Sequence, residues 1–295
     1  MSEGQSARGF FRPLRALSSI LDFGLVLPDY RYRNGQQVQR VPNARTTLYY
    51  AADVRRNSSA RTATGLFCEG PHSKSFGTLG ECGEMVAVKV RAGGLGALLG
   101  VPAKEVRDST LSLTEIWGRD ADLIAERMAE APSTRERVTI FQQELARRVQ
   151  RGLGYDPVAV AASNLIEQSG GRLRVSEIIE RSGYSQRALL QKFDQGVGLT
   201  PKQQARVARI RATIARMADP SVLDWAELAV RSGYADQAHM IHEFRDLVGH
   251  PPVKFIERRQ AFSPIGADAS GQSALPGREQ KLYQMLGMVS RWVGT

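Results

Sequence analysis

The chain has 295 residues, of which 42% are hydrophobic and 24% are charged, and its formal net charge at pH 7 is +10. This length allows two domains with separate cores, the composition is that of an ordinary globular protein, and the positive charge favours a polyanionic partner. No apolar run reaches the roughly 18 residues that a membrane span needs, and polar side chains interrupt residues 14–27 too often for a signal peptide. The sequence therefore predicts a cytoplasmic protein without a membrane partner.

Residues 1–150 are predicted to form an α+β domain. Its strands are expected where β-branched and aromatic residues lie between turn-forming residues. Residues 111–149 are expected to be helical, with a break at Pro132, because their apolar residues recur at helical spacing. The expected strands are residues 46–51, 65–68 and 85–90.

A short joint that contains two glycines, residues 152–154, is the predicted boundary to a second domain over residues 155–260. Asp156 followed by Pro157 is a strong helix start, because an aspartate caps free backbone N–H groups and a proline suits the first helical position. The second domain is predicted to be all-α, with about seven helices.

Residues 263–295 are predicted to be a flexible linker followed by an amphipathic helix. The linker is rich in Ser, Gly, Ala and Pro, which bury too little apolar surface to order a segment alone. The helix has apolar residues on one face and is expected to dock on another surface. These residues are Leu282, Met285, Leu286, Val289 and Trp292.

No catalytic residue, metal site or cofactor is predicted. The glycines from Gly93 to Gly96 lack the Gly-Lys-Ser/Thr ending of a phosphate loop, so they are expected to form a turn that leads into a helix. His239 and His242 have i, i+3 spacing but no nearby carboxylates for further metal ligands. Two cysteines, far apart in the sequence, are too few for a disulfide framework or a zinc site.

An internal repeat is the most informative feature of the second domain. Residues 181–184, Arg-Ser-Gly-Tyr, recur as residues 231–234, and each copy lies between two short segments with helical spacing. Gly183 and Gly233 suit a turn with positive φ between two helices. The pattern predicts a helix, a tight turn and a second helix, twice.

Residues at the start and on the outward face of the second helix of each unit are the candidate DNA-binding residues. Arg and Gln among them have the geometry to read guanine and adenine edges in the major groove. In the first unit they are Ser185, Gln186, Arg187, Leu190 and Gln191. In the second unit they are Asp236, Gln237, His239, Ile241 and His242.

Between the units, residues 202–216 contain five basic residues and no acidic one. A helix over residues 201–217 is expected to hold the two units apart as a stiff rod of roughly 25 Å. Arg206, Arg209 and Arg211 of this helix are added to the candidate DNA-binding residues as partners of phosphate.

These motifs resemble those of the AraC/XylS family of transcription regulators. In the first unit the resemblance lies in Gly183, Tyr184, Ser185, Arg187, Leu189 and Phe193, followed by Gly198, Thr200 and Pro201. In the second it lies in Gly233, Tyr234, Asp236, Gln237, His239 and Phe244, then Gly249, Pro251 and Phe255, and Arg209 stands at the position of the arginine of the family's linker helix. The resemblance implies sequence-specific binding of double-stranded DNA and contact with RNA polymerase.

The chain departs from the family pattern at several of these positions. Ile179 replaces a small residue, Gln204 replaces an aromatic one, and Gln191 and His242 stand where many relatives have an arginine. The base preference of relatives is therefore not expected to carry over.

The first half resembles an uncharacterised domain found ahead of AraC-type domains in bacteria. The resemblance rests on Val41-Pro42, Gly70-Pro71 and, above all, residues 90–118. It implies that this domain senses a signal, with a small-molecule effector as one partner, or forms a homodimer.

Two alternatives remain open. Some AraC-type domains are fused to DNA-repair proteins that accept an alkyl group on a cysteine, for which Cys68 and Cys82 are the candidates. The acidic residues around Cys82 oppose thiolate formation. The other alternative is a partner protein that keeps the fold but has lost DNA binding, which Arg187 and the basic residues 202–216 disfavour.

Overall fold

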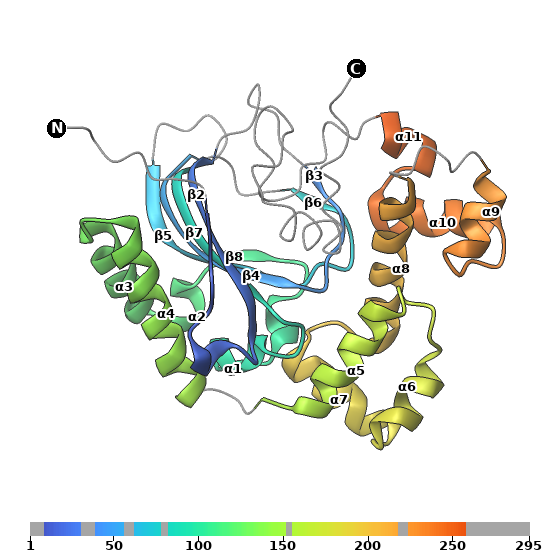
Figure 1. Ribbon diagram of the computed structural model, residues 1–295, viewed down its shortest axis with the longest axis horizontal. Coiled ribbons are helices and arrows are strands. Elements are labelled where there is room, and N and C mark those ends of the chain that lie inside the picture. Colours follow the sequence, from blue (N-terminus) through green and yellow to red (C-terminus); the bar gives the residue numbers. More distant parts are fainter. Residues whose placement is uncertain are drawn as a thin grey trace.

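The computed structural model describes residues 9–30, 39–55, 62–77, 82–151, 155–217 and 224–257. A sheet forms the centre of the molecule, with helices α3 (Arg119–Glu130) and α4 (Thr134–Arg151) along one side and the helices from residue 157 onward along the other (Figure 1). The predicted joint and the predicted C-terminal linker and helix lie outside the described residues. Within the described ranges, no helix is both long and apolar enough to cross a bilayer.

Most strands of the described residues belong to one antiparallel sheet. The strands are β1 (Gly9–Phe11), β2 (Leu21–Tyr30), β3 (Gln39–Arg40), β4 (Thr46–Arg55), β5 (Thr62–Glu69), β6 (Phe76–Gly77), β7 (Cys82–Val90) and β8 (Thr110–Ser112). The six-stranded sheet has the order β1-β2-β7-β4-β5-β8, and β3 pairs with β6 in a separate sheet. The three predicted strands lie within β4, β5 and β7, so their prediction is confirmed.

Side chains alternate between the two faces of the sheet along each strand, and apolar side chains are buried on both faces. On one face Leu48 and Val88 belong to a core with residues of α1 (Leu95–Leu99), α3 and α4. On the opposite face Phe23, Tyr49 and Ala87 belong to a second core. The turn before α1, at Gly93 and Gly94, is the one predicted.

The predicted helical region starts three residues too early. Thr110–Ser112 form β8, in which Leu111 pairs with Cys68 of β5. A short edge strand takes its conformation from its partner strand rather than from local propensity, so the sequence pattern did not show it. The helices that follow are α2 (Thr114–Trp117), α3 and α4, with the break at Pro132 as predicted.

A buried charged cluster lies at one end of the second face. Lys89, only 3% exposed, donates a hydrogen bond to Thr47, and the Glu69 carboxylate accepts one from Arg40 at 2.8 Å. Burial opposes ionisation of Glu69, but Arg40 and Lys89 outweigh it and lower the pKa of Glu69. Burial lowers the pKa of Lys89 to about 8. The cluster is therefore a net cation inside the sheet domain.

The second domain is all-helical within the described residues, as predicted. Its helices are α5 (Pro157–Gln168), α6 (Val175–Ser182), α7 (Gln186–Gly196), α8 (Pro201–Met217), α9 (Trp225–Arg231), α10 (Gln237–Val248) and α11 (Pro252–Glu257). Asp156 caps α5 through hydrogen bonds from the N–H groups of Val158 and Ala159, both 3.0 Å. Val207 of α8 joins the core around α5 to α7, and Ile210 joins the core around α9 to α11.

The sheet domain touches both halves of the helical domain. Gly93 donates a backbone hydrogen bond to the Gly196 carbonyl at the end of α7 (3.1 Å), and Ser75 donates one to Leu247 of α10 (2.7 Å). Two small loop residues, Ala44 and Ala92, belong to the core around α7. The two domains therefore pack against each other through backbone contacts as well as side chains.

Candidate DNA interface

The first helix-turn-helix unit consists of α6, a turn and α7. Gly183 has φ 70°, which suits a residue without a Cβ, and Ser185 caps α7 by accepting a hydrogen bond from the Ala188 N–H at 3.2 Å. Leu189 and Phe193 are fully buried and fix α7 to the core of the unit. This is the geometry that the sequence pattern predicted.

The opposite side of α7 faces solvent. The five predicted residues of this unit are all exposed, and they are Ser185, Gln186, Arg187, Leu190 and Gln191. Positions 186, 187, 190 and 191 lie on one helical face, because 186 and 190, like 187 and 191, are four residues and therefore about one turn apart. Arg187 is exposed and forms no ion pair within the described residues.

The second unit, α9, a turn and α10, repeats this arrangement. Gly233 has φ 83°, and Asp236 caps α10 by accepting a hydrogen bond from the His239 N–H at 2.7 Å. The His239 ring packs edge-on against Tyr234, with 5.3 Å between ring centroids. Of the predicted residues, Asp236, Gln237, His239 and His242 are exposed and Ile241 is half-buried.

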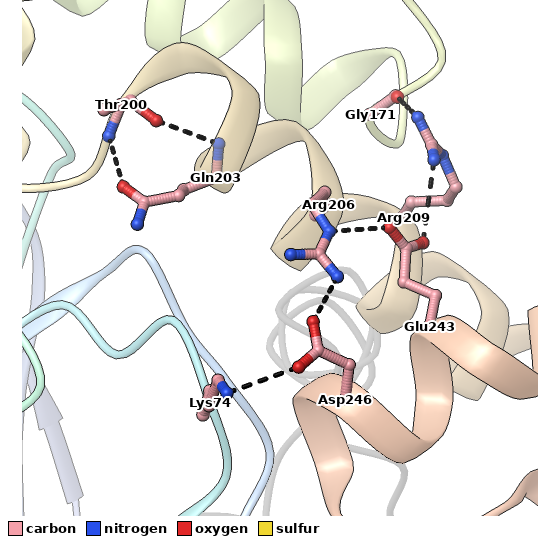
Figure 2. A network of polar contacts seen from close by, with 8 residues as sticks. All are labelled: Lys74, Gly171, Thr200, Gln203, Arg206, Arg209, Glu243 and Asp246. Atoms are coloured by element: carbon pink, nitrogen blue, oxygen red, sulfur yellow. Dashed lines mark hydrogen bonds and ion pairs between the residues drawn. The ribbon is translucent and has the colours of Figure 1, made fainter.

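A polar network joins the two units through α8 (Figure 2). Arg206 binds Glu243 (Nε to Oε1, 2.9 Å) and Asp246 (Nη2 to Oδ2, 2.6 Å) of α10. Arg209 donates to the Gly171 carbonyl between α5 and α6 (2.9 Å), and its other Nη lies 3.6 Å from Glu243. The network therefore connects the loop before the first unit, the helix α8 and the second unit.

The ionisation of this network follows from its geometry. Burial alone would lower the pKa of Arg206, but hydrogen bonds to Asp246 and Glu243 raise it. The hydrogen bond from Arg206 is the main reason that the pKa of Asp246 is lowered. Lys74 of the sheet domain also binds Asp246, at 3.3 Å (Figure 2). These contacts therefore favour the charged forms of Arg206 and Asp246, and the network extends to the sheet domain.

The predicted phosphate-binding arginines of α8 thus have partners inside the protein. Arg206 and Arg209 face α10 and the loop after α5. Arg211 is half-buried near Glu167 and Arg45, and desolvation lowers its pKa. Their contact with DNA stays a prediction, whereas the role of Arg206 and Arg209 in holding α10 is a feature of the structure.

Sequence reasoning missed the acidic partners in this network. Glu243 and Asp246 lie on α10 one turn apart, but Glu243 is 37 residues from Arg206 along the chain. The buried position of Glu243, 4% exposed, was the available signal, since it falls on the same face as Met240 and Phe244. A charged residue at a core position implies a buried partner.

The two cysteines lie in the interior of the sheet domain. Cys68 and Cys82 are both buried, and neither forms a disulfide within the described residues. Burial, and then the Glu69 carboxylate, raise the pKa of the Cys68 thiol. No group of three His, Cys, Asp or Glu side chains in the described ranges is arranged to hold a metal ion.

Two helix-turn-helix units with exposed second helices define the class of helix-turn-helix DNA-binding proteins. Comparison with protein families supports this class, since residues 178–258 match the helix-turn-helix domain family. Residues 178–258 therefore form a helix-turn-helix domain of the kind found in the AraC/XylS family, which the sequence motifs resemble.

Solved structures of ToxT from Vibrio cholerae are also similar. A ToxT structure at 1.65 Å resolution is 13% identical to this chain, with a TM-score of 0.40. The match covers 79% of this chain and 98% of the ToxT chain. ToxT from strain O395 is 11% identical, TM-score 0.39, with 79% and 97% covered. ToxT O395 bound to (E)-4-(8-methylnaphthalen-1-yl)but-3-enoic acid is 12% identical, TM-score 0.40, with 79% and 98% covered. No curated protein matches the chain significantly.

Proposed function

We propose that this regulator reads two adjacent major-groove segments of double-stranded DNA, with α7 in one and α10 in the next. The observation that carries the proposal is that α8 and the network of Arg206 and Arg209 hold two exposed recognition helices at a fixed separation. A helix of 17 residues spans roughly 25 Å, which is compatible with half-sites about 10 base pairs apart on one face of the duplex.

Within this proposal each recognition helix offers both polar and apolar contacts. Arg187 suits a guanine edge, and Gln186, Gln191 and Gln237 suit adenine. Leu190 and Ile241 are placed to contact thymine methyl groups. The remaining predicted residues, Ser185, Asp236, His239 and His242, lie at the start of these helices or on their exposed side.

Footprinting on a selected genomic fragment tests the two-segment proposal. A protomer that engages both units should protect two segments whose centres are about 10 base pairs apart. Protection of about five base pairs per protomer would show that only one unit enters the groove. The same experiment with no protection at any salt concentration would favour the partner-protein alternative.

Replacing Arg187 with alanine should weaken binding to the selected site by about 1 to 3 kcal/mol and relax base preference at one position. The reason is that Arg187 has no ion-pair partner within the described residues, so the substitution chiefly removes the contact between its guanidinium and the base. Lys202→Ala is the matched control, since it removes an exposed cation from the start of α8 rather than from the exposed face of α7. Fluorescence anisotropy on the selected and a scrambled duplex measures both effects, and equal losses on the two duplexes would contradict the base-reading role of Arg187.

The sheet domain is proposed to receive the signal. Its contacts with α7 and α10, through Gly93 and Ser75, support this role because a ligand that moves the sheet domain also moves both recognition helices. A small-molecule effector, homodimer formation and contact with RNA polymerase belong to the same proposal. The alkyl-acceptor alternative is disfavoured by the burial of both cysteines and the raised pKa of Cys68.

A further inference from the structure

A five-residue segment of the sheet domain, residues 71–75, reaches both helix-turn-helix units, and we call it the bridge segment. At its start, the Pro71 ring packs against the turn after α7, since its Cγ lies 2.7 Å from the position that a Cβ on Gly198 would occupy. At its end, the Ser75 N–H donates a hydrogen bond to the Leu247 carbonyl in the last turn of α10, at 2.7 Å. One short segment therefore contacts the end of each recognition helix.

The bridge segment is itself held in place by the sheet domain. His72, only 4% exposed, exchanges two backbone hydrogen bonds with Asn43, at 2.8 and 3.0 Å. The Asp108 N–H donates a hydrogen bond to the Pro71 carbonyl at 2.9 Å. The Asp108 carboxylate accepts hydrogen bonds from the N–H of Ser73 at 2.6 Å and from its hydroxyl at 2.9 Å. Asp108 therefore fixes the backbone of the segment between its two points of contact with the helical domain.

An ion pair adds to the contact between the bridge segment and α10. Lys74 binds Asp246 at 3.3 Å, and the same carboxylate binds Arg206 of α8 at 2.6 Å (Figure 2). The Lys74 side chain is 65% exposed, so this ion pair alone contributes little stability. The hydrogen bond from the Ser75 N–H matters more, because the last carbonyls of a helix have no partner within the helix. The position of α10 therefore depends chiefly on the backbone of the bridge segment.

The bridge segment connects the two units a second time. The units have separate hydrophobic cores, to which α8 contributes Val207 on one side and Ile210 on the other. A helix of this length can bend slightly, and a bend in α8 would change the distance between α7 and α10. With the bridge segment in place, such a bend would have to disturb the contacts of Pro71 or Ser75 as well.

We propose that the bridge segment sets the spacing between the two DNA half-sites that the protein accepts, a proposal that rests on the proposed function. Asp108 and Lys74 are positioning residues in this role, since one fixes the segment and the other joins it to α10. Two recognition helices held at one separation need no further ordering on binding, which favours one spacing over its neighbours. One base pair more or less moves a half-site by about 3.4 Å and turns it by about 35° around the duplex.

Binding to a series of duplexes tests the proposal. Each duplex carries the two half-sites protected in footprinting, with up to two base pairs inserted or removed between them. For the wild type, one inserted base pair should lower the affinity by about tenfold or more, because contacts at one half-site are lost. For Lys74→Ala/Asp108→Gly the same insertion should cost no more than about threefold, since the loosened units can both stay in contact with DNA. The affinity of this variant for a single half-site should equal that of the wild type.

Two further variants serve as controls. Asp53→Gly/Lys104→Ala removes the same charges from exposed positions outside the bridge segment. Asp53 also has a positive φ, 53°, close to the 56° of Asp108, so glycine suits both positions equally. Lys74→Arg/Asp108→Asn keeps a cation opposite α10 and an acceptor for Ser73. Both controls should show the wild-type dependence on spacing, and thermal unfolding checks that every variant is folded.

The possible results separate this proposal from the proposed function. The role of the bridge segment would be overturned, and the proposed function would stand, if the wild type protects two segments but accepts every spacing equally. The same holds if Lys74→Ala/Asp108→Gly depends on spacing as the wild type does, or loses the same affinity at every spacing. A wild-type footprint confined to a single segment would overturn the proposed function.

Discussion

Glu243→Ala should destabilise the second unit by about 2 to 4 kcal/mol, somewhat less than the roughly 3 to 5 kcal/mol of a fully buried ion pair, because the Arg206 side chain is 31% exposed. The substitution removes the carboxylate that binds Arg206 and lies near Arg209, so both guanidinium groups lose a partner at the surface of α10. Chemical denaturation measures the loss in the free energy of unfolding. Footprinting at decreasing protein concentration should show that the DNA segment assigned to α10 loses protection before the segment assigned to α7.

Glu227→Ala is the matched control for this prediction. Glu227 is exposed, and its ion pair with Arg231 spans one turn of α9, so its removal should change the free energy of unfolding by less than about 0.5 kcal/mol. A double-mutant cycle of Arg206→Ala and Glu243→Ala should give a coupling energy of at least about 1 kcal/mol. Additive effects of the two substitutions would contradict the role of the network.

Lys89→Met should change how stability depends on pH. Lys89 has a folded-state pKa of about 8 and an ordinary value of 10.5, so between these values the unfolded chain holds a proton that the folded protein has released. The stability of the wild type should therefore rise with pH over this window, by up to about 3 kcal/mol relative to the variant.

Denaturation curves at several pH values from 7 to 10.5 test this prediction. Below pH 8 the free energies of unfolding of the two proteins should run parallel, because Lys89 is then protonated in both the folded and the unfolded chain. The same parallel course above pH 8 would show that the Lys89 ammonium is not desolvated in the folded protein.

The helical domain was predictable from the sequence because its determinants are local. Pro201 and the unbroken run that follows specify α8, and the two turn glycines specify both helix-turn-helix units. The exposed face of α7 followed from the spacing of Leu189 and Phe193, since residues 187 and 191 lie on the opposite side of the helix from these core positions.

The remaining features depend on residues that are distant in the sequence. The strand β8 forms because Leu111 pairs with Cys68, and Arg206 of α8 packs against α10 because it binds the buried Glu243. Neither pair leaves a periodic pattern in one sequence, so sequence reasoning assigned residue 111 to a helix and Arg206 to phosphate. Whether Arg206 also contacts DNA stays a prediction.

The backbone contact between Gly93 and Gly196 limits how far the two domains can be exchanged as modules. A Cβ on Gly196 would lie 2.8 Å from the Gly93 carbonyl oxygen, and one on Gly96 would lie 2.4 Å from the Gln195 carbonyl oxygen. A chimera that joined the helical domain to a foreign N-terminal domain would place side chains at this contact. It would avoid them only if the foreign domain also had glycines at the positions of Gly93 and Gly96. Chimeras that keep both Gly93 and Gly196 should preserve the orientation of α7 relative to the N-terminal domain. Other chimeras would need a different set of contacts between the two domains.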